Sequence, residues 1–160
     1  MKGALKLDKG FIVVEYERNL IKRVYWTNES EEEKNFPGRE LFIDYFSGKK
    51  VDFGELNIDL TDLPSFFKRI YEVARRIPYG KVTSYKSISE LIGNSKLQRV
   101  VGNAMKNNPF LIIVPCHRVI KSDGSLGNFS LGVEFKKYLL TLEGVRLENE
   151  KVSCFRYWWY

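Results

Sequence analysis

The chain has 160 residues, of which 44% are hydrophobic, and this suffices for one core or for two small lobes. No apolar stretch is long enough to span a bilayer, and the N-terminus lacks the apolar core of a signal peptide. We therefore expect neither a membrane protein nor an exported one. Two cysteines then predict free thiols in a reducing compartment, the cytoplasm. With a single histidine they do not form a zinc set, and we expect no metal and no cofactor.

The net charge of +6 is distributed unevenly along the chain. Residues 1–55 carry 10 Lys and Arg against 11 Asp and Glu, whereas residues 56–160 carry 16 against 9. Between Pro64 and Lys121 the count is 11 basic against 2 acidic residues. A basic segment of this kind is typical of proteins that bind a polyanion, and a solvated surface is the alternative.

The first third predicts a small antiparallel sheet followed by a helix. Ala4 to Thr27 is rich in β-forming residues, with turns at Asp8-Lys9-Gly10 and at Arg18-Asn19. A helix is expected to start at Pro37 and to end at Gly48. Residues 49–62 have little periodicity and are expected to form a linker.

The middle of the chain predicts three helices. The first follows Asp62, a candidate cap, and extends to about Ile77. The second covers Ser84 to Ile92 behind a Thr83 cap, and the third covers Lys96 to Lys106 behind a Ser95 cap. A short glycine-containing turn separates the last two, which is typical of a helix-turn-helix, although two ordinary packed helices are the alternative. Basic and polar residues at spacings of three and four form a stripe on the third helix: Lys96, Arg99, Asn103 and Lys106.

The candidate nucleophile follows this pair of helices. Phe110 to Val114 is the longest uninterrupted apolar run and predicts a buried strand, which Pro115 ends because proline cannot donate to a sheet. Cys116 comes next, with His117, the only histidine, beside it. A neighbouring imidazole can accept the thiol proton, and Arg118 adds charge that favours the reactive thiolate. A small buried hydrophobic residue beside a turn is the alternative.

A loop from Lys121 to Ser130 leads to a last predicted helix, Val133 to Glu143. The apolar face expected for this helix consists of Phe135, Tyr138, Leu139 and Leu142. The helix dipole disfavours a carboxylate at the C-terminal end, where Glu143 stands. A partner such as a histidine would explain that position, and simple exposure is the alternative. The aromatic tail from Phe155 is expected to pack against a lobe.

A set of short motifs in this order resembles the O6-alkylguanine-DNA alkyltransferases, the suicidal DNA-repair proteins. The resemblance is dense from Leu63 to Gly144 and only architectural before that. It predicts an α+β fold with a small N-terminal sheet lobe over residues 1–55 and a mainly helical DNA-binding and alkyltransferase domain over residues 56–160. The motifs that carry it are Ile77-Pro78-Tyr79-Gly80-Lys81-Val82, Ser84-Tyr85, Arg99-Val100-Val101-Gly102, Asn108-Pro109, Val114-Pro115-Cys116-His117-Arg118-Val119, Leu139-Leu140 and Glu143-Gly144.

The resemblance implies a mechanism. The helix-turn-helix enters the minor groove of double-stranded DNA, and the alkylated base is flipped out of the duplex. Glu143, His117 and a water deprotonate Cys116, which takes the alkyl group irreversibly from O6-alkylguanine, or from O4-alkylthymine, while Asn108 braces the preceding turn. The protein is expected to act as a monomer. The DNA-binding residues implied are Tyr85, which promotes base rotation, Arg99, which fills the vacated stack, and Lys96, Gly102, Asn103, Lys106, Thr83 and Ser84. The pocket residues implied are Pro115, Val119, Phe129, Ser130, Gly127 and Met105.

Three features depart from the family pattern. Phe129 stands where many members carry a tyrosine whose hydroxyl donates to guanine O6, so that donor is absent. Leu131 stands where a glycine is common and is expected to narrow the pocket. The N-terminal zinc ligands of some members are missing.

Two other functions compete with the alkyltransferase. A related lesion-binding protein flips the base without removing the alkyl group, but such relatives lack the cysteine. A thiol hydrolase would bring its base from a distant segment, and this chain has one histidine only.

Overall fold

The N-terminal part of the protein is a four-stranded sheet with one helix. The computed structural model describes residues 1–160. Strands β1 (Lys2–Leu7), β2 (Gly10–Glu17) and β3 (Leu20–Thr27) form the expected antiparallel meander. A short strand, β4 (Asn57–Ile58), pairs in parallel with β3 at the edge. The predicted linker over residues 49–62 is therefore wrong in part, because a two-residue strand is too short to show any periodicity.

Helix α1 (Arg39–Phe46) confirms the predicted helix of the first third. Phe42 and Tyr45 are fully buried, and Phe42 contacts the ring of Phe53 at a centroid distance of 4.9 Å. Gly48 follows the helix with a φ of +87°, a left-handed conformation that glycine adopts without steric cost. Tyr45 also contacts the ring of Phe53, so these three aromatic residues form one buried cluster beside α1.

The chain divides into two compact units. The N-terminal unit comprises residues 1–62 together with residues 109–113, and the C-terminal unit comprises residues 63–108 and 114–160. The fold class is confirmed, with a small sheet lobe and a mainly helical part that contains Cys116. No helix is long and apolar enough to cross a membrane.

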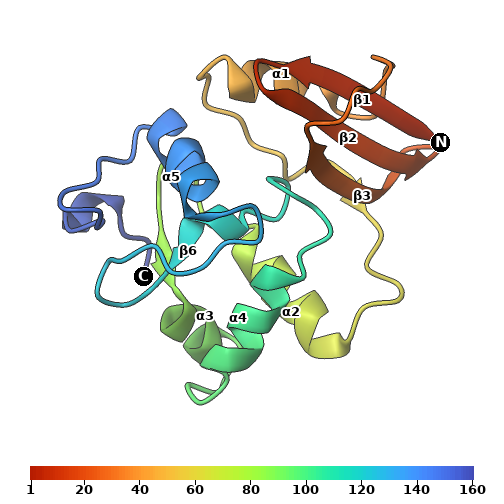
Figure 1. Cartoon of the computed structure of the whole chain (residues 1–160). Coiled ribbons are helices and arrows are strands. Elements are labelled where there is room, and N and C mark those ends of the chain that lie inside the picture. Colours follow the sequence, from red (N-terminus) through yellow and green to blue (C-terminus); the bar gives the residue numbers. More distant parts are fainter. The chain divides into compact units, whose positions relative to one another are not determined.

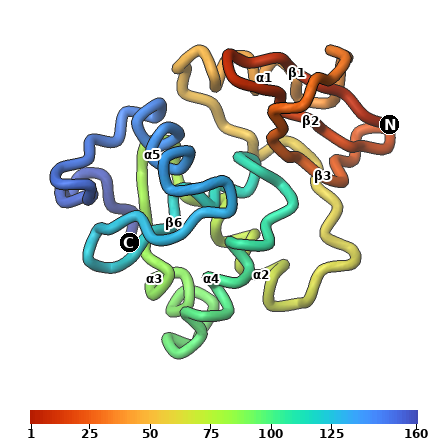
Figure 2. Tube along the Cα trace, in the orientation of Figure 1, coloured from red at the N-terminus to blue at the C-terminus, as the bar shows by residue number.

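Helices α2, α3 and α4 of the C-terminal unit pack against one another (Figure 1). A two-stranded parallel pair, β5 with β6, stands beside them. The end of the chain returns to β5, because Val82 N donates to Tyr157 O at 2.7 Å and Trp159 N donates to Val82 O at 2.7 Å (Figure 2). The expected packing of the aromatic tail is therefore confirmed in part: Tyr157 is buried in the core and Trp158 packs against it, whereas Phe155 and Tyr160 are exposed. The elements of this unit are α2 (Ser65–Ala74), β5 (Thr83–Ser84), α3 (Tyr85–Leu91), α4 (Gln98–Lys106), the 3₁₀ turn η1 (Cys116–Arg118), β6 (Val119–Ile120), α5 (Val133–Leu142) and the 3₁₀ turn η2 (Phe155–Tyr157).

The helix-turn-helix is present, but its caps differ from the prediction. Ser84, not Thr83, caps α3, because its hydroxyl accepts a hydrogen bond from Ser87 N at 2.9 Å. Helix α4 begins at Gln98 without a side-chain cap. The side chain of Asn94 accepts from Lys96 N at 2.9 Å, which keeps residues 94–96 in a turn.

The apolar run before Cys116 is buried, but the predicted strand is wrong. Ile112 has a φ of +71°, which a β-branched residue rarely adopts, and Ile113 N donates to Leu111 O at 2.9 Å across a three-residue turn. The apolar composition of residues 110–114 predicted their burial correctly. Their backbone conformation depends on the surrounding tertiary structure, and composition does not predict it.

The buried face of α5 also differs from the prediction. Lys136, Leu139 and Leu140 are fully buried, whereas Tyr138 is half exposed. A lysine can occupy this face because carbonyl oxygens accept from its ammonium group, as the site geometry below describes.

Candidate active site

A turn at Pro115 presents Cys116 to a cavity. Pro115 has φ −79° and ψ 66°, and Cys116 N donates to Val114 O at 2.8 Å, which is an inverse γ-turn. Residues 116–118 then form one turn of 3₁₀ helix, in which successive side chains point in directions about 120° apart. Cys116 lines a cavity of about 560 Å³. The turn thus points His117 and Arg118 away from the thiol, whereas in a strand Arg118 would lie on the same side as Cys116.

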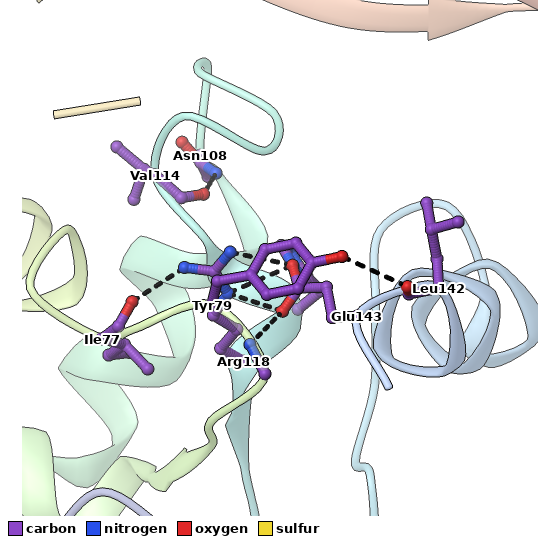
Figure 3. A network of polar contacts seen from close by, with 9 residues as sticks. Ile77, Tyr79, Asn108, Val114, Arg118, Leu142 and Glu143 are labelled. Carbon is purple, nitrogen blue, oxygen red and sulfur yellow. Dashed lines mark hydrogen bonds and ion pairs between the residues drawn. The ribbon is translucent and has the colours of Figure 1, made fainter. Parts of the chain in front are cut away.

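Arg118 pairs with the buried carboxylate of Glu143 (Figure 3). His117 shares the same carboxylate. His117 Nε2 lies 2.6 Å from Glu143 Oε1. Arg118 donates from Nε to Oε2 at 2.9 Å and from a terminal nitrogen to Oε1 at 2.9 Å, and its other terminal nitrogen donates to Ile77 O at 2.7 Å. The side chains of His117 and Glu143 are fully inaccessible to solvent. Glu143, the residue that ends α5, is therefore held by a partner histidine and is not exposed.

These contacts fix the protonation states of the pair. Burial opposes ionisation of Glu143, but the charges and hydrogen bonds of His117 and Arg118 bring its pKa well below the ordinary value. Burial lowers the pKa of His117, against the pull of Glu143, so the imidazole is neutral at pH 7. An ionised carboxylate only accepts, so Nε2 carries the proton, and Nδ1 is left as the basic nitrogen.

The guanidinium of Arg118 is engaged by Glu143, and the expected effect of its charge on the thiolate stays a prediction. Its charge faces Glu143, and its carbon lies 5.8 Å from the ring centroid of Tyr79. Its position keeps Glu143 ionised, and an ionised Glu143 in turn orients the imidazole.

The side chain of Asn108 lies against the turn that carries Cys116, where the resemblance expects it to brace the nucleophile. Its side-chain amide donates to Val114 O at 2.8 Å and to Cys116 Sγ at 3.2 Å. Burial raises the pKa of the Cys116 thiol, while Asn108 and the cation of Lys136 act in the opposite direction. In the resting protein the sulfur is therefore a thiol that needs a base.

Lys136 is a functional candidate of this site that the sequence prediction missed. Its ammonium group is fully buried and donates to Leu126 O at 2.6 Å, to Val119 O at 2.7 Å and to Tyr85 Oη at 3.4 Å. Burial lowers the pKa of Lys136 to about 8, so it still carries its charge at neutral pH. Its spacing of three and four residues from Leu139 and Leu140 was the signal available in the sequence.

The cavity brings together most, but not all, of the predicted pocket and DNA-binding residues. Pro115 and Val119 do not line it, because Pro115 forms the turn and Val119 lies in β6. Phe129 lines it without a hydroxyl and stacks on Phe135 at a centroid distance of 6.4 Å. The predicted residues that line it, besides Cys116, are Tyr85, Arg99, Gly102, Met105, Lys106, Gly127, Phe129 and Ser130, and those not predicted are Gln98, Lys121 and Asn128.

The remaining predicted DNA-binding residues lie elsewhere. Lys96 and Asn103 are exposed, but Lys96 precedes α4 and Asn103 accepts a hydrogen bond from the side chain of Asn107. Thr83 and Ser84 are buried, Thr83 donating to Tyr160 O and Ser84 capping α3. Both hydroxyls are thus hydrogen-bonded within the protein, and their contact with DNA stays a prediction.

Comparisons with known proteins converge on one family. The family described as "6-O-methylguanine DNA methyltransferase, DNA binding domain" matches residues 65–145. A methylated-DNA–protein-cysteine methyltransferase from Sulfolobus acidocaldarius is 41% identical over 147 residues, which cover 89% of this chain and 86% of that protein.

Solved structures agree with the sequence match. The crystal structure of Mycobacterium tuberculosis OGT in complex with DNA has a TM-score of 0.76 and 28% identity, and the match covers 89% of this chain and 92% of that one. The structure of S. pombe Atl1 with damaged DNA containing O6-carboxymethylguanine has a TM-score of 0.55 and 34% identity, but covers only 59% of this chain and 94% of that one.

Proposed function

Because this chain belongs to the methylated-DNA–protein-cysteine methyltransferase family, we propose that it repairs DNA by moving the alkyl group of O6-alkylguanine onto Cys116. O4-alkylthymine is a further candidate substrate. The observation that carries the assignment is a cysteine that lines a cavity and directly precedes a histidine oriented by a buried glutamate. The cysteine also disfavours a purely lesion-binding protein, which would need no nucleophile.

The transfer is a single displacement. Nδ1 of His117 receives the thiol proton, through a water in the scheme that the resemblance implies, and Glu143 stabilises the imidazolium that forms. The Cys116 sulfur then bonds to the alkyl carbon as the carbon–O6 bond breaks. The electron pair stays on guanine, which takes up a proton. The thioether product has no route back to the thiol, so each molecule acts once.

Lys136 supports this step as a fixed cation. The thiolate carries a full negative charge in a site from which water is largely excluded, where a preoriented cation acts strongly. Its contact with Tyr85, which lines the cavity, also ties the pocket wall to α5. We assign Lys136 as a positioning residue that stabilises the thiolate and holds Tyr85.

DNA docking is proposed for the α4 face of the helix-turn-helix, in the minor groove. Arg99 and Lys106 are exposed there and line the cavity, and Gly102 between them allows close approach of the duplex. Arg99 fills the stack after base flipping, and Tyr85 promotes the rotation. Because the basic segment neutralises phosphates, affinity should fall as salt rises.

The division of labour remains part of the proposal. Residues 56–160 carry DNA binding and transfer, and residues 1–55 form the accessory lobe. Both cysteines are free thiols, which fits a cytoplasmic protein that reaches the nucleoid through DNA and works as a monomer.

The test is the intact mass of the protein after incubation with a duplex that carries one O6-methylguanine. We expect one added methyl group per chain, located on Cys116. Cys116→Ser should bind the duplex and gain nothing, because a hydroxyl is much harder to deprotonate than a thiol. Cys154→Ser is the matched control and should react normally. Tight binding of the lesion without any added mass would identify a lesion-binding protein instead, and a methyl group on Cys154 would overturn the site.

A further inference from the structure

All the charged side chains that line the cavity beside Cys116 are positive. Its lining includes three cations, Arg99, Lys106 and Lys121, and no aspartate or glutamate. Arg99 and Lys106 belong to α4, the proposed docking helix. Lys121 lies instead on the loop that follows β6; it is the last residue of the basic segment, but it lies outside α4 and takes no part in the transfer step.

The backbone of Lys121 is fixed in a tight loop. Lys121 N donates to Ser125 O at 3.0 Å, and Gly124 N donates to Lys121 O at 3.0 Å. Its side-chain stem lies along Gly127, since a Cβ added to that glycine would come within 3.6 Å of Lys121 Cγ and within 3.4 Å of Tyr85 Oη. The stem of Lys121 and the hydroxyl of Tyr85 therefore flank the same piece of cavity wall.

The charge of Lys121 is also available. The side chain is exposed and forms no ion pair within 4 Å, although its charge interacts with that of Asp123 on the same loop. In contrast, the neighbouring Lys151 lies 3.9 Å from Asp123 on the same loop. An unpaired lysine at the wall of a cavity that has no acidic lining creates a positive potential where an adduct would lie.

We propose that Lys121 adapts this pocket to O6-alkyl groups that end in a carboxylate, of which carboxymethyl is the simplest. This inference rests on the proposed function of Cys116. A carboxylate next to the reacting carbon repels the incoming thiolate, and it must leave water to enter a cavity whose walls include Met105 and Phe129. A cation at the cavity wall attracts the carboxylate, which offsets both its repulsion of the thiolate and the cost of removing it from water. The repulsion is offset most strongly in the transition state, where the carboxylate and the sulfur are closest.

The chemistry is the same displacement with a charged group. The Cys116 sulfur forms a bond to the CH₂ carbon, the bond from that carbon to guanine O6 breaks, and the electron pair stays on O6. His117 takes the thiol proton, and guanine takes up one proton in exchange. The product is an S-carboxymethyl cysteine whose carboxylate remains within the positive field of Lys121.

The experiment compares single-turnover rates at saturating duplex for three adducts, O6-methyl-, O6-carboxymethyl- and O6-carbamoylmethylguanine. The carbamoylmethyl group is nearly the same size as carboxymethyl but uncharged, so the ratio of their rates isolates the charge. The proteins are the wild type, Lys121→Gln and the matched control Lys86→Gln, which removes one exposed charge of α3 outside the cavity lining.

We expect Lys121→Gln to lower the carboxymethyl-to-carbamoylmethyl rate ratio about tenfold, the scale of one charge-assisted contact, and to leave methyl transfer unchanged. Lys86→Gln should keep the wild-type ratio, and Lys121→Glu should lower it further. An unchanged ratio in Lys121→Gln overturns the inference, and so does a parallel slowing of all three adducts, which would make Lys121 a phosphate contact. Failure of the wild type to transfer methyl at all would instead overturn the proposed function.

Discussion

All the polar and charged residues that are buried in this protein lie in the C-terminal unit, whereas the residues that form the buried core of the N-terminal unit are apolar or aromatic. The N-terminal sheet and α1 bury side chains such as Ile12, Val13 and Phe42, whose transfer from water is favourable at every position. The C-terminal unit buries His117, Arg118, Lys136 and Glu143, whose desolvation is unfavourable unless each charge finds partners.

In the C-terminal unit the burial of charged side chains costs folding free energy, and the reactivity of Cys116 is the reason that we infer for it. Glu143 is hydrogen-bonded to His117 and Arg118, and backbone carbonyl oxygens accept hydrogen bonds from Lys136. Replacing such groups by apolar residues of the same size is often neutral or stabilising, so burial of charge is weak evidence for a stabilising role. The charges are better explained by what they do to the Cys116 thiol. This explanation is tested by substitutions for which the free energy of unfolding and the rate of methyl transfer are both measured.

The largest effect is expected for Glu143→Ala. It leaves Arg118 buried without its carboxylate and His117 without its orienting acceptor, and removing one partner of a buried pair costs about 3–5 kcal/mol. Urea unfolding should show that loss, and methyl transfer by the folded fraction should nearly vanish. Glu143→Gln keeps the shape and part of the hydrogen bonding, so it should be more stable than Glu143→Ala while still transferring slowly. An alanine variant as stable as the wild type would show that the network does not hold the fold.

The next effect concerns Lys136→Gln, with Lys137→Gln as its control. Removing the buried cation raises the pKa of the Cys116 thiol, so the rising limb of the pH–rate profile should move to higher pH. At pH 7 the rate should fall about tenfold for each unit of that displacement. Lys137 pairs with Glu150 at the surface, and its removal should leave the profile in place. A Lys136→Gln profile that coincides with the wild type would exclude thiolate stabilisation.

Arg99→Ala tests an exposed charge of the same unit. Extruding a base costs a few kcal/mol of stacking and pairing, and an inserted guanidinium offsets part of it. Transfer from saturating duplex should therefore slow about ten- to a hundredfold, while transfer from free O6-methylguanine base and the free energy of unfolding should change little. Equal slowing on duplex and free base would place Arg99 in the pocket or the fold, and normal transfer at saturation would make it a phosphate contact only.

The sequence predicted most of the N-terminal unit and the motifs of the active site. The β-branched residues of β2 and the apolar face of α1 are local patterns, and Cys116, His117 and Glu143 belong to motifs that a family resemblance can place. The irregular backbone at Ile112 could not be predicted, because a run of apolar residues has no periodicity and a positive φ there depends on packing from distant segments. Lys136 was missed because a lysine is assigned to the surface unless the position of its partners is known.

The same limit applies to the surfaces of α4 and α5. A shift of a helix start by two residues moved Lys96 off α4, and a rotation of the buried stripe exposed Tyr138. Both depend on which neighbours the helix packs against, and helical spacing alone does not specify them.

The pH dependence of stability should reflect the buried charges of the C-terminal unit. The pKa of His117 is lowered, so the unfolded chain binds a proton as pH falls through about 6.5 while the folded chain does not, and stability is lost below that pH. The pKa of Glu143 is also lowered, so its contribution is complete above about 4.5 and is lost as pH falls further. Each unbalanced proton gives a slope of about 1.4 kcal/mol per pH unit. Urea midpoints between pH 7 and pH 4 measure the slope, which should be shallower below pH 4.5 in Glu143→Gln; a flat wild-type curve would contradict both assignments.

The smallest effect is expected for Ile12→Val in β2, which is fully buried in the N-terminal unit. The change removes one methylene group from an apolar core and should cost about 0.5–1.5 kcal/mol in urea unfolding. Ile120→Val, an equally buried residue of β6 in the C-terminal unit, is the matched variant and should lose a similar amount. Because the N-terminal core contains none of the groups that act on the thiol, Ile12→Val should leave the single-turnover rate of the folded fraction unchanged. A slower rate in Ile12→Val, measured where the variant is fully folded, would show that packing of the N-terminal sheet is coupled to the reactivity of Cys116, and the separation of the two units by chemistry would no longer hold.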